Sequence, residues 1–458
     1  MKKFDWKTAE WRPSRTPDKS HSSDTGQAKV QKPRHKDANW YNDQGSKIVA
    51  KIYQQDLKAP DGLFKPVAHI VDAEFMASYN WLDEEMPTII VPGAPPVWTT
   101  SKPEPALKMN PNPYFQDVNA AKWPKYPIEP AIRAMLAMKR GFCTKEIDVV
   151  TNAKTLINLL EFASSESRHL KLDVEVVGYT VFILRREDSP QALSSFLAID
   201  GQKFCEENTT WGSEVENSIS NHRIIQYHFG GLRLLVESEC HGFFSKGAPE
   251  TLQVTSSPQD ILRNRIGTPN GSEKGSLIIR QGGCVVPQQV TFSLQPCLHS
   301  KNMHMEAHKR CLWAGHTKNL VSIYHADGIF KDFEIYDMEE SLKNWEVQNT
   351  ANLSQLANLL QQIIGLVKQS NSGKLFITRA GGVLECQEQT KIPTSVLPVD
   401  LKARWGEMSA INYRPSGFRP ANDTDSARSS WEHISGDDNE ETDDDWVEIR
   451  QLRYRGPG

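Results

Sequence analysis

The 458-residue sequence predicts an α/β (α+β) fold, with a mixed sheet and flanking helices. The stretch Asn221–Phe244 places two apolar strands around a Gly230-Gly231 turn, which is the pattern of a β-hairpin. Apolar residues recur at helical spacing over 352–368, which predicts an amphipathic helix. Segments of both periods alternate along the chain, so helices and strands should share one core.

The other elements follow from local pattern and turn chemistry. The run Thr88–Trp98 reads as a short buried strand that ends in a proline-rich wrap. Pro130 suits the first turn of a helix, and Gly178 suits the turn between two strands over 174–187. The remaining predictions are helices over 148–162, 196–207 and 312–324, strands over 277–279 and 290–294, and a hairpin across Gly381-Gly382.

Composition divides the chain into three parts. Residues 1–45 are polar and basic, and residues 411–458 are acidic, so neither segment can bury enough apolar surface to offset its chain entropy. We expect two disordered tails around one globular domain, residues 46–410. A stretch rich in Ser, Pro, Gly and Asn predicts an insertion loop near 245–275.

Overall charge and cysteine usage exclude several classes of protein. The chain has 53 basic and 57 acidic residues, a net charge of −4, so nucleic-acid binding would need a local basic patch. No secretory leader and no membrane-length apolar run is present, which predicts no membrane partner. Seven cysteines are scattered and odd in number, which favours reduced thiols in an intracellular protein, nuclear or cytoplasmic.

The second strand of the hairpin carries the first candidate site. Glu237, Glu239 and His241 alternate there, so their side chains should share one face of the strand. Carboxylate and imidazole groups on one edge could bind a metal ion. The alternative is an ordinary half-exposed strand, or a Glu239 paired with Arg223 or Arg233 across the hairpin.

Four segments resemble a fungal family catalogued under the label "geranylgeranyl pyrophosphate synthetase". They are YNWLDEEMPTIIVPGAPPVW, DVNAAKWPKYPIEPAIRAML, HRIIQYHFGGLRLLVE and LWAGHTKNLVSIYHADGIF. A prenyl diphosphate synthase would be all-helical and would carry two Asp-rich motifs on facing helices. The run Asp443–Asp445 lies in the acidic tail, and the body is rich in predicted strands, so this function is disfavoured.

The segment DVVTNAKTLINLL is similar to the V-T-W-R-G-x-L-x-K-L segment of DXO-type decapping exonucleases, members of the PD-(D/E)XK superfamily. The resemblance implies a PD-(D/E)XK nuclease-like core. In that family, acids on a helix and two strands hold Mg²⁺ for RNA cleavage. Here the family's R-G arginine falls on Ala153, its F-E on Phe204-Cys205, its E-x-D on Glu239-Cys240-His241 and its E-x-K on Ser293-Leu294-Gln295.

These replacements imply a catalytically degenerate nuclease-like protein with an RNA-binding or scaffold role, and with RNA or a protein as its partner. No resident cofactor is expected. The alternative is an active Mg²⁺-dependent decapping or nuclease enzyme with an altered site. The remnant catalytic residues would be Glu206, Glu237, Glu239 and His241, the last two also as metal ligands; Arg223, Arg233 and Lys318 would contact RNA, with Tyr227, Phe229 and Trp313 for base stacking.

Overall fold

Two mixed sheets with flanking helices form the part of the chain that the computed structural model describes. The described residues are 47–58, 68–99, 114–115, 117–139, 141–166, 169–187, 190, 193–194, 201–245, 276–298, 305–326, 329–389 and 395–411. Nearly all of the two expected tails and of the expected insertion loop lies outside these residues. Within them, no helix is long and apolar enough to cross a membrane.

The larger sheet has eleven described strands, and most neighbours are antiparallel. Three pairs are parallel: β12 with β6, β6 with β8, and β14 with β3. In spatial order the strands are β1 (Ile48–Tyr53), β19 (Val383–Glu388), β18 (Lys374–Ala380), β7 (Lys171–Val177), β8 (Thr180–Arg185), β6 (Val149–Asn152), β12 (Leu232–Cys240), β11 (Ser218–Phe229), β2 (Val71–Leu82), β3 (Thr88–Pro92) and β14 (Ile278–Gly282).

The smaller sheet adjoins the far end of the β11–β12 hairpin, because β13 begins two residues after β12 ends. Its six described strands, in spatial order, are β10 (Thr209–Thr210), β4 (Val97–Trp98), β13 (Gly242–Phe243), β15 (Thr291–Leu298), β16 (Asn319–Ala326) and β17 (Ile329–Asp337). A further pair joins β5 (Tyr114–Phe115) to β9 (Leu193–Ser194).

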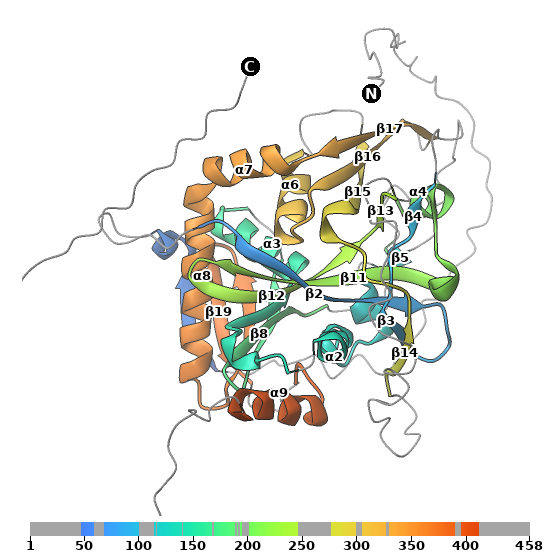
Figure 1. Ribbon diagram of the computed structural model, residues 1–458. Helices are drawn as coiled ribbons and strands as arrows, with labels where there is room; N and C mark the ends of the chain where they lie inside the picture. Colours follow the sequence, from blue (N-terminus) through green and yellow to red (C-terminus); the bar gives the residue numbers. More distant parts are fainter. Residues whose placement is uncertain are drawn as a thin grey trace, which may run out of the picture. The chain divides into compact units, whose positions relative to one another are not determined.

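Helices cover both faces of the larger sheet (Figure 1). Successive side chains of β8 point to opposite faces of the sheet. Ile183 packs with α3 and α8 on one face, whereas Phe182 packs with α2 and α9 on the other. The described α-helices are α1 (Val118–Lys122), α2 (Glu129–Met138), α3 (Ala153–Ala163), α4 (Gly201–Asn208), α6 (Met305–Ala314), α7 (Glu339–Gln348), α8 (Thr350–Gln369) and α9 (Val399–Ile411).

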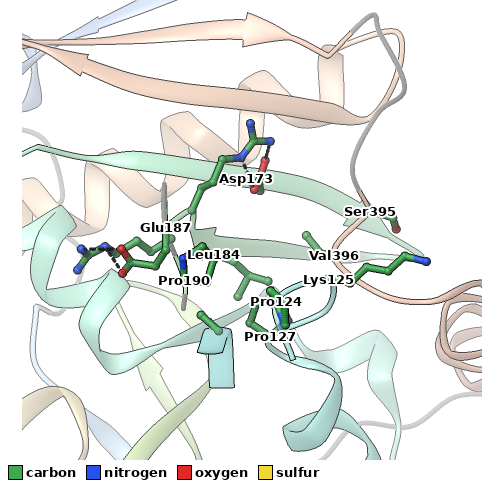
Figure 2. Close-up of a pocket in the computed structure, with 12 residues that line it drawn as sticks. Pro124, Lys125, Pro127, Asp173, Leu184, Glu187, Pro190, Ser395 and Val396 are labelled. Atoms are coloured by element: carbon green, nitrogen blue, oxygen red, sulfur yellow. Dashed lines mark hydrogen bonds and ion pairs between the residues drawn. The ribbon is translucent and has the colours of Figure 1, made fainter. Parts of the chain in front are cut away.

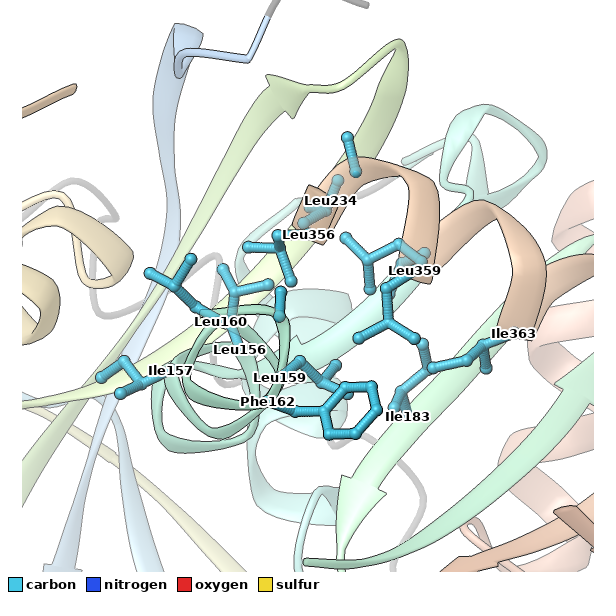
Figure 3. Packing of buried hydrophobic residues seen from close by; sticks show 14 of the residues in the cluster. Leu156, Ile157, Leu159, Leu160, Phe162, Ile183, Leu234, Leu356, Leu359 and Ile363 are labelled. Carbon is cyan, nitrogen blue, oxygen red and sulfur yellow. The ribbon is translucent and has the colours of Figure 1, made fainter. Parts of the chain in front are cut away.

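The predicted helix over 352–368 is confirmed as α8, which supplies much of the main core. The predicted stripe is almost fully buried: Leu353, Leu356, Leu360, Ile363 and Val367. Figure 3 shows this packing between α3 and α8, through Leu156, Leu159, Leu160 and Phe162 on the first helix and Leu356, Leu359 and Ile363 on the second.

Two predicted helices are partly wrong. The segment 148–162 begins as strand β6 and becomes helix only after Asn152, whose side chain accepts a hydrogen bond from the Thr155 amide at 2.8 Å. The β-branched run Val149–Thr151 fits a buried strand, which outweighs the helical pattern that follows it. The segment 312–324 contains the end of α6 and then strand β16, with His316 at positive φ between them.

The hairpin at the centre of the sheet is confirmed. Its register pairs Phe229 with Leu232, His222 with Glu239 and Ile224 with Glu237. Gly230 and Gly231 form the turn, both with positive φ, at 60° and 77°. Gly230 also touches α8, because a Cβ there would lie 2.4 Å from the Cβ of Ala357.

This turn yields a prediction with a matched control. Gly231→Ala should cost about 1 kcal/mol of folding free energy, because alanine disfavours positive φ and nothing lies within 4 Å of its new Cβ. Gly230→Ala should cost about 2–4 kcal/mol, because it adds an overlap with α8 to the same backbone strain. Urea denaturation of both variants measures the difference. Equal losses would contradict close packing of the turn on α8.

Candidate functional site

A buried carboxylate, Glu237, joins four elements near the end of β12. Its Oε1 accepts a hydrogen bond from His222 Nδ1 on β11 at 2.6 Å and from Asn119 Nδ2 on α1 at 3.2 Å. Asn119 Oδ1 in turn accepts from Tyr79 and Trp81 of β2, at 2.8 and 2.7 Å. The side chains of this network thereby hydrogen-bond to one another, and buried polar groups need such partners to be stable.

His222 is a second titratable member of this network. Burial lowers its pKa, but the hydrogen bond that it donates to Glu237 and the charges of Glu237, Glu239 and Asp117 outweigh burial, so the pKa is raised. The ring stacks on Tyr79, with centroids 5.0 Å apart, and its Nε2 lies 3.0 Å from Ser220 Oγ. Ser220, His222 and Glu237 resemble a nucleophile–base–acid relay. However, Ser220 is only 5% exposed, so its hydroxyl is not accessible as a nucleophile.

Glu239 and Lys154 lie beside each other at the strand ends. The parallel pairing of β6 and β12 sets Asn152 opposite Glu237, and Lys154 and Glu239 each lie two residues further on. Both side chains are exposed to solvent, and we call the place where they lie the recess. Burial is nevertheless the largest single influence on the pKa of each group. Against that influence, nearby opposite charges lower the pKa of Glu239 and raise the pKa of Lys154.

Helix α4 and strand β15 approach the same strand end. Cys205 Sγ on α4 donates a hydrogen bond to the His241 carbonyl at 3.1 Å, and the His241 amide donates to the Phe292 carbonyl at 3.3 Å. Phe204, Phe292 and Leu294 pack together in one small core. The three segments that resemble the family's acid-bearing motifs therefore meet in this fold.

The side chains at these positions are mostly neutral. Burial raises the pKa of the Cys205 thiol to about 12, so it is protonated at neutral pH and is neither a nucleophile nor a ready metal ligand. Gln295 Nε2 donates to Ser293 Oγ at 3.3 Å. Burial lowers the pKa of His241, and its Nδ1 has no hydrogen-bond partner among the described residues.

The predicted catalytic acids have different environments. Glu206 is exposed on α4, next to Cys205, and Glu239 is exposed at the end of β12. Glu237 is buried and already bonded to two donors. Within the described part of the chain, no three His, Cys, Asp or Glu side chains are placed to hold one metal ion. The residues present therefore do not fit a magnesium site, which needs several converging oxygens.

The three predicted RNA contacts have separate sets of partners. Arg223 is 1% exposed, donates to Gln288 Oε1 and to the Val286 carbonyl at 2.6 and 2.7 Å, and stacks on Phe75. Burial lowers its pKa to about 10, so it is still charged at neutral pH. Because its guanidinium is enclosed, the prediction of a surface contact to RNA does not hold for this residue. It instead ties β11 to the segment leading into β15.

The other two basic residues pair with acids. Arg233 pairs with Glu146 and donates to His228 Nε2 at 3.0 Å. Lys318 lies 3.1 Å from Glu339 and 3.5 Å from Asp337. Their contact with RNA stays a prediction. The aromatic residues expected to stack on bases are core instead: Tyr227, Phe229 and Trp313 are at most 3% exposed.

A pocket of about 60 Å³ lies beside the site (Figure 2). Its walls are apolar, with Pro124, Pro127 and Pro190, and its polar side chains include Lys125, Arg185 and Arg186. Arg185 pairs with Glu187, and Arg186 pairs with Asp173. Lys125 has no ion-pair partner among the described residues and lies 5.0 Å from the Tyr126 ring centroid. Ala120 joins the pocket to the site, because it follows Asn119 on α1.

Sequence reasoning missed Lys154, His222 and Asn119. The spacing of Ser220 and His222 on a strand opposite Glu237 signals a shared face, once the hairpin register is known. Asn152 signals a helix cap, and a cap there places Lys154 in the first helical turn. Nothing in the sequence pairs α1 with β12, so the Asn119 contact follows only from the tertiary fold.

From the hydrogen bonds of Glu237 we predict that replacing its carboxylate by an amide destabilises the fold. Glu237→Gln should lower the free energy of unfolding by about 2 kcal/mol, because it removes the buried carboxylate that accepts hydrogen bonds from His222 and Asn119. Glu239→Gln, on the exposed position of the same strand, should cost less than about 1 kcal/mol. Urea denaturation at neutral pH compares the two, and equal effects would contradict the account.

The same pair sets the sign of a pH effect. Folded His222 binds its proton more tightly than the unfolded residue, whose pKa is near 6.5. The stabilisation is therefore complete below that pH and is lost as the pH rises through the folded pKa. Denaturation over a pH series should show this decline in the wild type and a weaker one in Glu237→Gln.

Comparisons with known proteins place the chain in a family. A family model described as a domain of unknown function (DUF8563) matches residues 47–392. No curated protein matches the chain. Among solved structures, S. pombe Rai1 in complex with 3′-FADP has 12% identity and a TM-score of 0.49, and covers 74% of this chain and 99% of its own.

Two further structures are similar at lower scores. Candida albicans Rai1 in complex with pU5-Mn²⁺ has 10% identity and a TM-score of 0.45, over 80% of this chain and 100% of its own. K. lactis Dxo1 in complex with manganese has 9% identity and a TM-score of 0.39, over 77% and 97%. Because the family match spans most of the sequence, the chain belongs to the DUF8563 family.

Proposed function

We propose that this protein is a catalytically degenerate nuclease-like protein that binds single-stranded RNA without cleaving it. One observation carries the proposal. Helix α4 and strands β12 and β15 meet at one place, but they bring together a protonated thiol, a neutral Gln295–Ser293 pair and the carboxylate of Glu239. This arrangement supports a metal-site scaffold in which most of the ligands are replaced.

Hydrolysis of a phosphodiester needs more than this arrangement supplies. A metal-dependent nuclease must hold a divalent cation with several oxygens and must activate a water molecule. Glu237 could supply a second carboxylate, but its Oε1 already accepts two hydrogen bonds inside the protein. Releasing Glu237 would leave His222 and Asn119 without their acceptor, at a cost of several kcal/mol.

The residues that line the pocket in Figure 2 support the proposal that it binds an anionic ligand. Arg185 and Arg186 are balanced by acids, whereas Lys125 adds an exposed positive charge that no described acid pairs. Lys154 lies in the adjoining recess, and its charge and that of Arg185 act on each other. Local positive charge beside apolar walls suits a phosphate backbone with its attached bases, although the net charge of the chain is negative.

An active enzyme with an altered site is the second candidate. The observation in its favour is the exposed Glu206, which follows Cys205 on α4 and lies near enough to raise the pKa of that thiol. A shift of Glu206 toward Glu239 would bring two carboxylates to the recess. This route requires movement of α4, whereas RNA binding requires none.

A nuclease assay decides between the two. Wild-type protein should bind capped and 5′-phosphorylated single-stranded RNA in a mobility-shift or anisotropy assay, and leave both intact with Mg²⁺ or Mn²⁺. If the wild-type protein shortens the RNA or releases the cap, and Glu239→Gln does not, the protein is an active enzyme and the proposal of a degenerate nuclease is wrong. Intact RNA with no binding at low salt would overturn the RNA-binding role.

Lys125→Ala tests the pocket as the RNA-binding surface. It should weaken RNA affinity by about three- to tenfold and reduce the salt dependence, because it removes one phosphate contact. Lys145→Ala is a matched control, since Lys145 also lies over a tyrosine ring, 5.3 Å from the centroid of Tyr179. Fluorescence anisotropy at two salt concentrations measures both. Equal effects of the two variants would argue against the pocket.

A further inference from the structure

Lys154 is held beside the end of β12 by the backbone. Strand β6 ends at Asn152, opposite Glu237, and the Asn152 side chain caps α3 at once. The cap fixes Lys154 in the first turn of α3, alongside the end of β12. The backbone of Lys154 is therefore fixed by a capped helix rather than by a loop.

Three carboxylates from two elements lie near enough to act on the charge of the Lys154 ammonium group. Glu237 and Glu239 come from β12, and Asp117 comes from the start of α1, which the Asn119–Glu237 hydrogen bond holds against β12. The charges of Asp117, Glu239 and Glu237 raise the pKa of Lys154, in that order of effect, although burial opposes them. Lys154 is thus a fixed, protonated cation among acids.

We propose that the Lys154 ammonium takes the place of the divalent cation in this nuclease-like site and excludes a metal ion from it. The inference deepens the proposed function and rests on it, because it gives a physical reason for the loss of cleavage. The Lys154 charge acts on Asp117 and on Glu239, where it adds to the effects of His241 and His222. Mg²⁺ or Mn²⁺ must therefore compete with a tethered charge and be repelled by it. An ammonium group offers no open coordination position, so it activates no water molecule.

This arrangement differs from the simple loss of ligands. If lost ligands alone removed the metal, deleting the lysine would leave the recess without affinity for cations. If Lys154 excludes the metal, deleting it removes the lysine's charge from beside Glu239 and Asp117. Proteins commonly bind Mg²⁺ through one or two carboxylates, with water molecules and substrate phosphates as the other ligands. The two explanations therefore predict opposite results for one substitution.

The experiment measures Mn²⁺ binding to the full-length protein by electron paramagnetic resonance of the unbound ion. Lys154→Met removes the charge and keeps the aliphatic chain, whereas Lys154→Arg keeps the charge. We expect Lys154→Met to bind one Mn²⁺ at least about tenfold more tightly than the wild type, and Lys154→Arg to resemble the wild type. Mn²⁺ should also raise the melting temperature of Lys154→Met and not that of Lys154→Arg.

The site of any gained binding is checked with Lys154→Met/Glu239→Gln, which should lose it. Equal, weak Mn²⁺ binding by the wild type and Lys154→Met would overturn the inference, and intact RNA binding in the same preparation would leave the proposed function standing. Stoichiometric Mn²⁺ binding by the wild type, together with cleavage of RNA, would overturn both. If Lys154→Met is too unstable to titrate, Lys154→Gln provides the same comparison.

Discussion

The hydrogen bonds accepted by Glu237 hold the centre of this fold together. One carboxylate connects the hairpin strands β11 and β12, and through Asn119 it also connects α1 and β2. A buried charge of this kind is tolerated only because His222 and Asn119 donate hydrogen bonds to it. Removing any one partner leaves the remaining polar groups buried without a hydrogen bond, which is destabilising. The position of Lys154, Asp117 and Glu239 around the recess depends on this arrangement.

The same constraint separates fold from catalysis. The strands and helices around the site must lie in register, and that register is set by the hairpin, the cap at Asn152 and the core between α3 and α8. None of these depends on the residues at Cys205, Ser293 or Gln295. Under the proposed function, the acids at these positions are replaced without loss of the fold.

Much of the fold is readable from the sequence because its pattern is local. The α8 helix and the three glycine-centred hairpins follow from spacing and turn residues. The strand at 149–152 is harder to predict from the sequence. A run of four residues before a helix is too short to show the two-residue period of a strand. The site could be read only in part: the replaced acids follow from the resemblance, whereas the burial of Arg223 and the approach of Lys154 depend on contacts between distant segments.

The most direct test is a crystal structure of the wild-type protein with a short single-stranded RNA and Mn²⁺, with anomalous data that locate the manganese. We predict intact RNA next to the pocket lined by Lys125, the Lys154 ammonium close to Glu239, and no manganese in the recess. Manganese coordinated by Glu239 next to a cleaved strand would contradict the account.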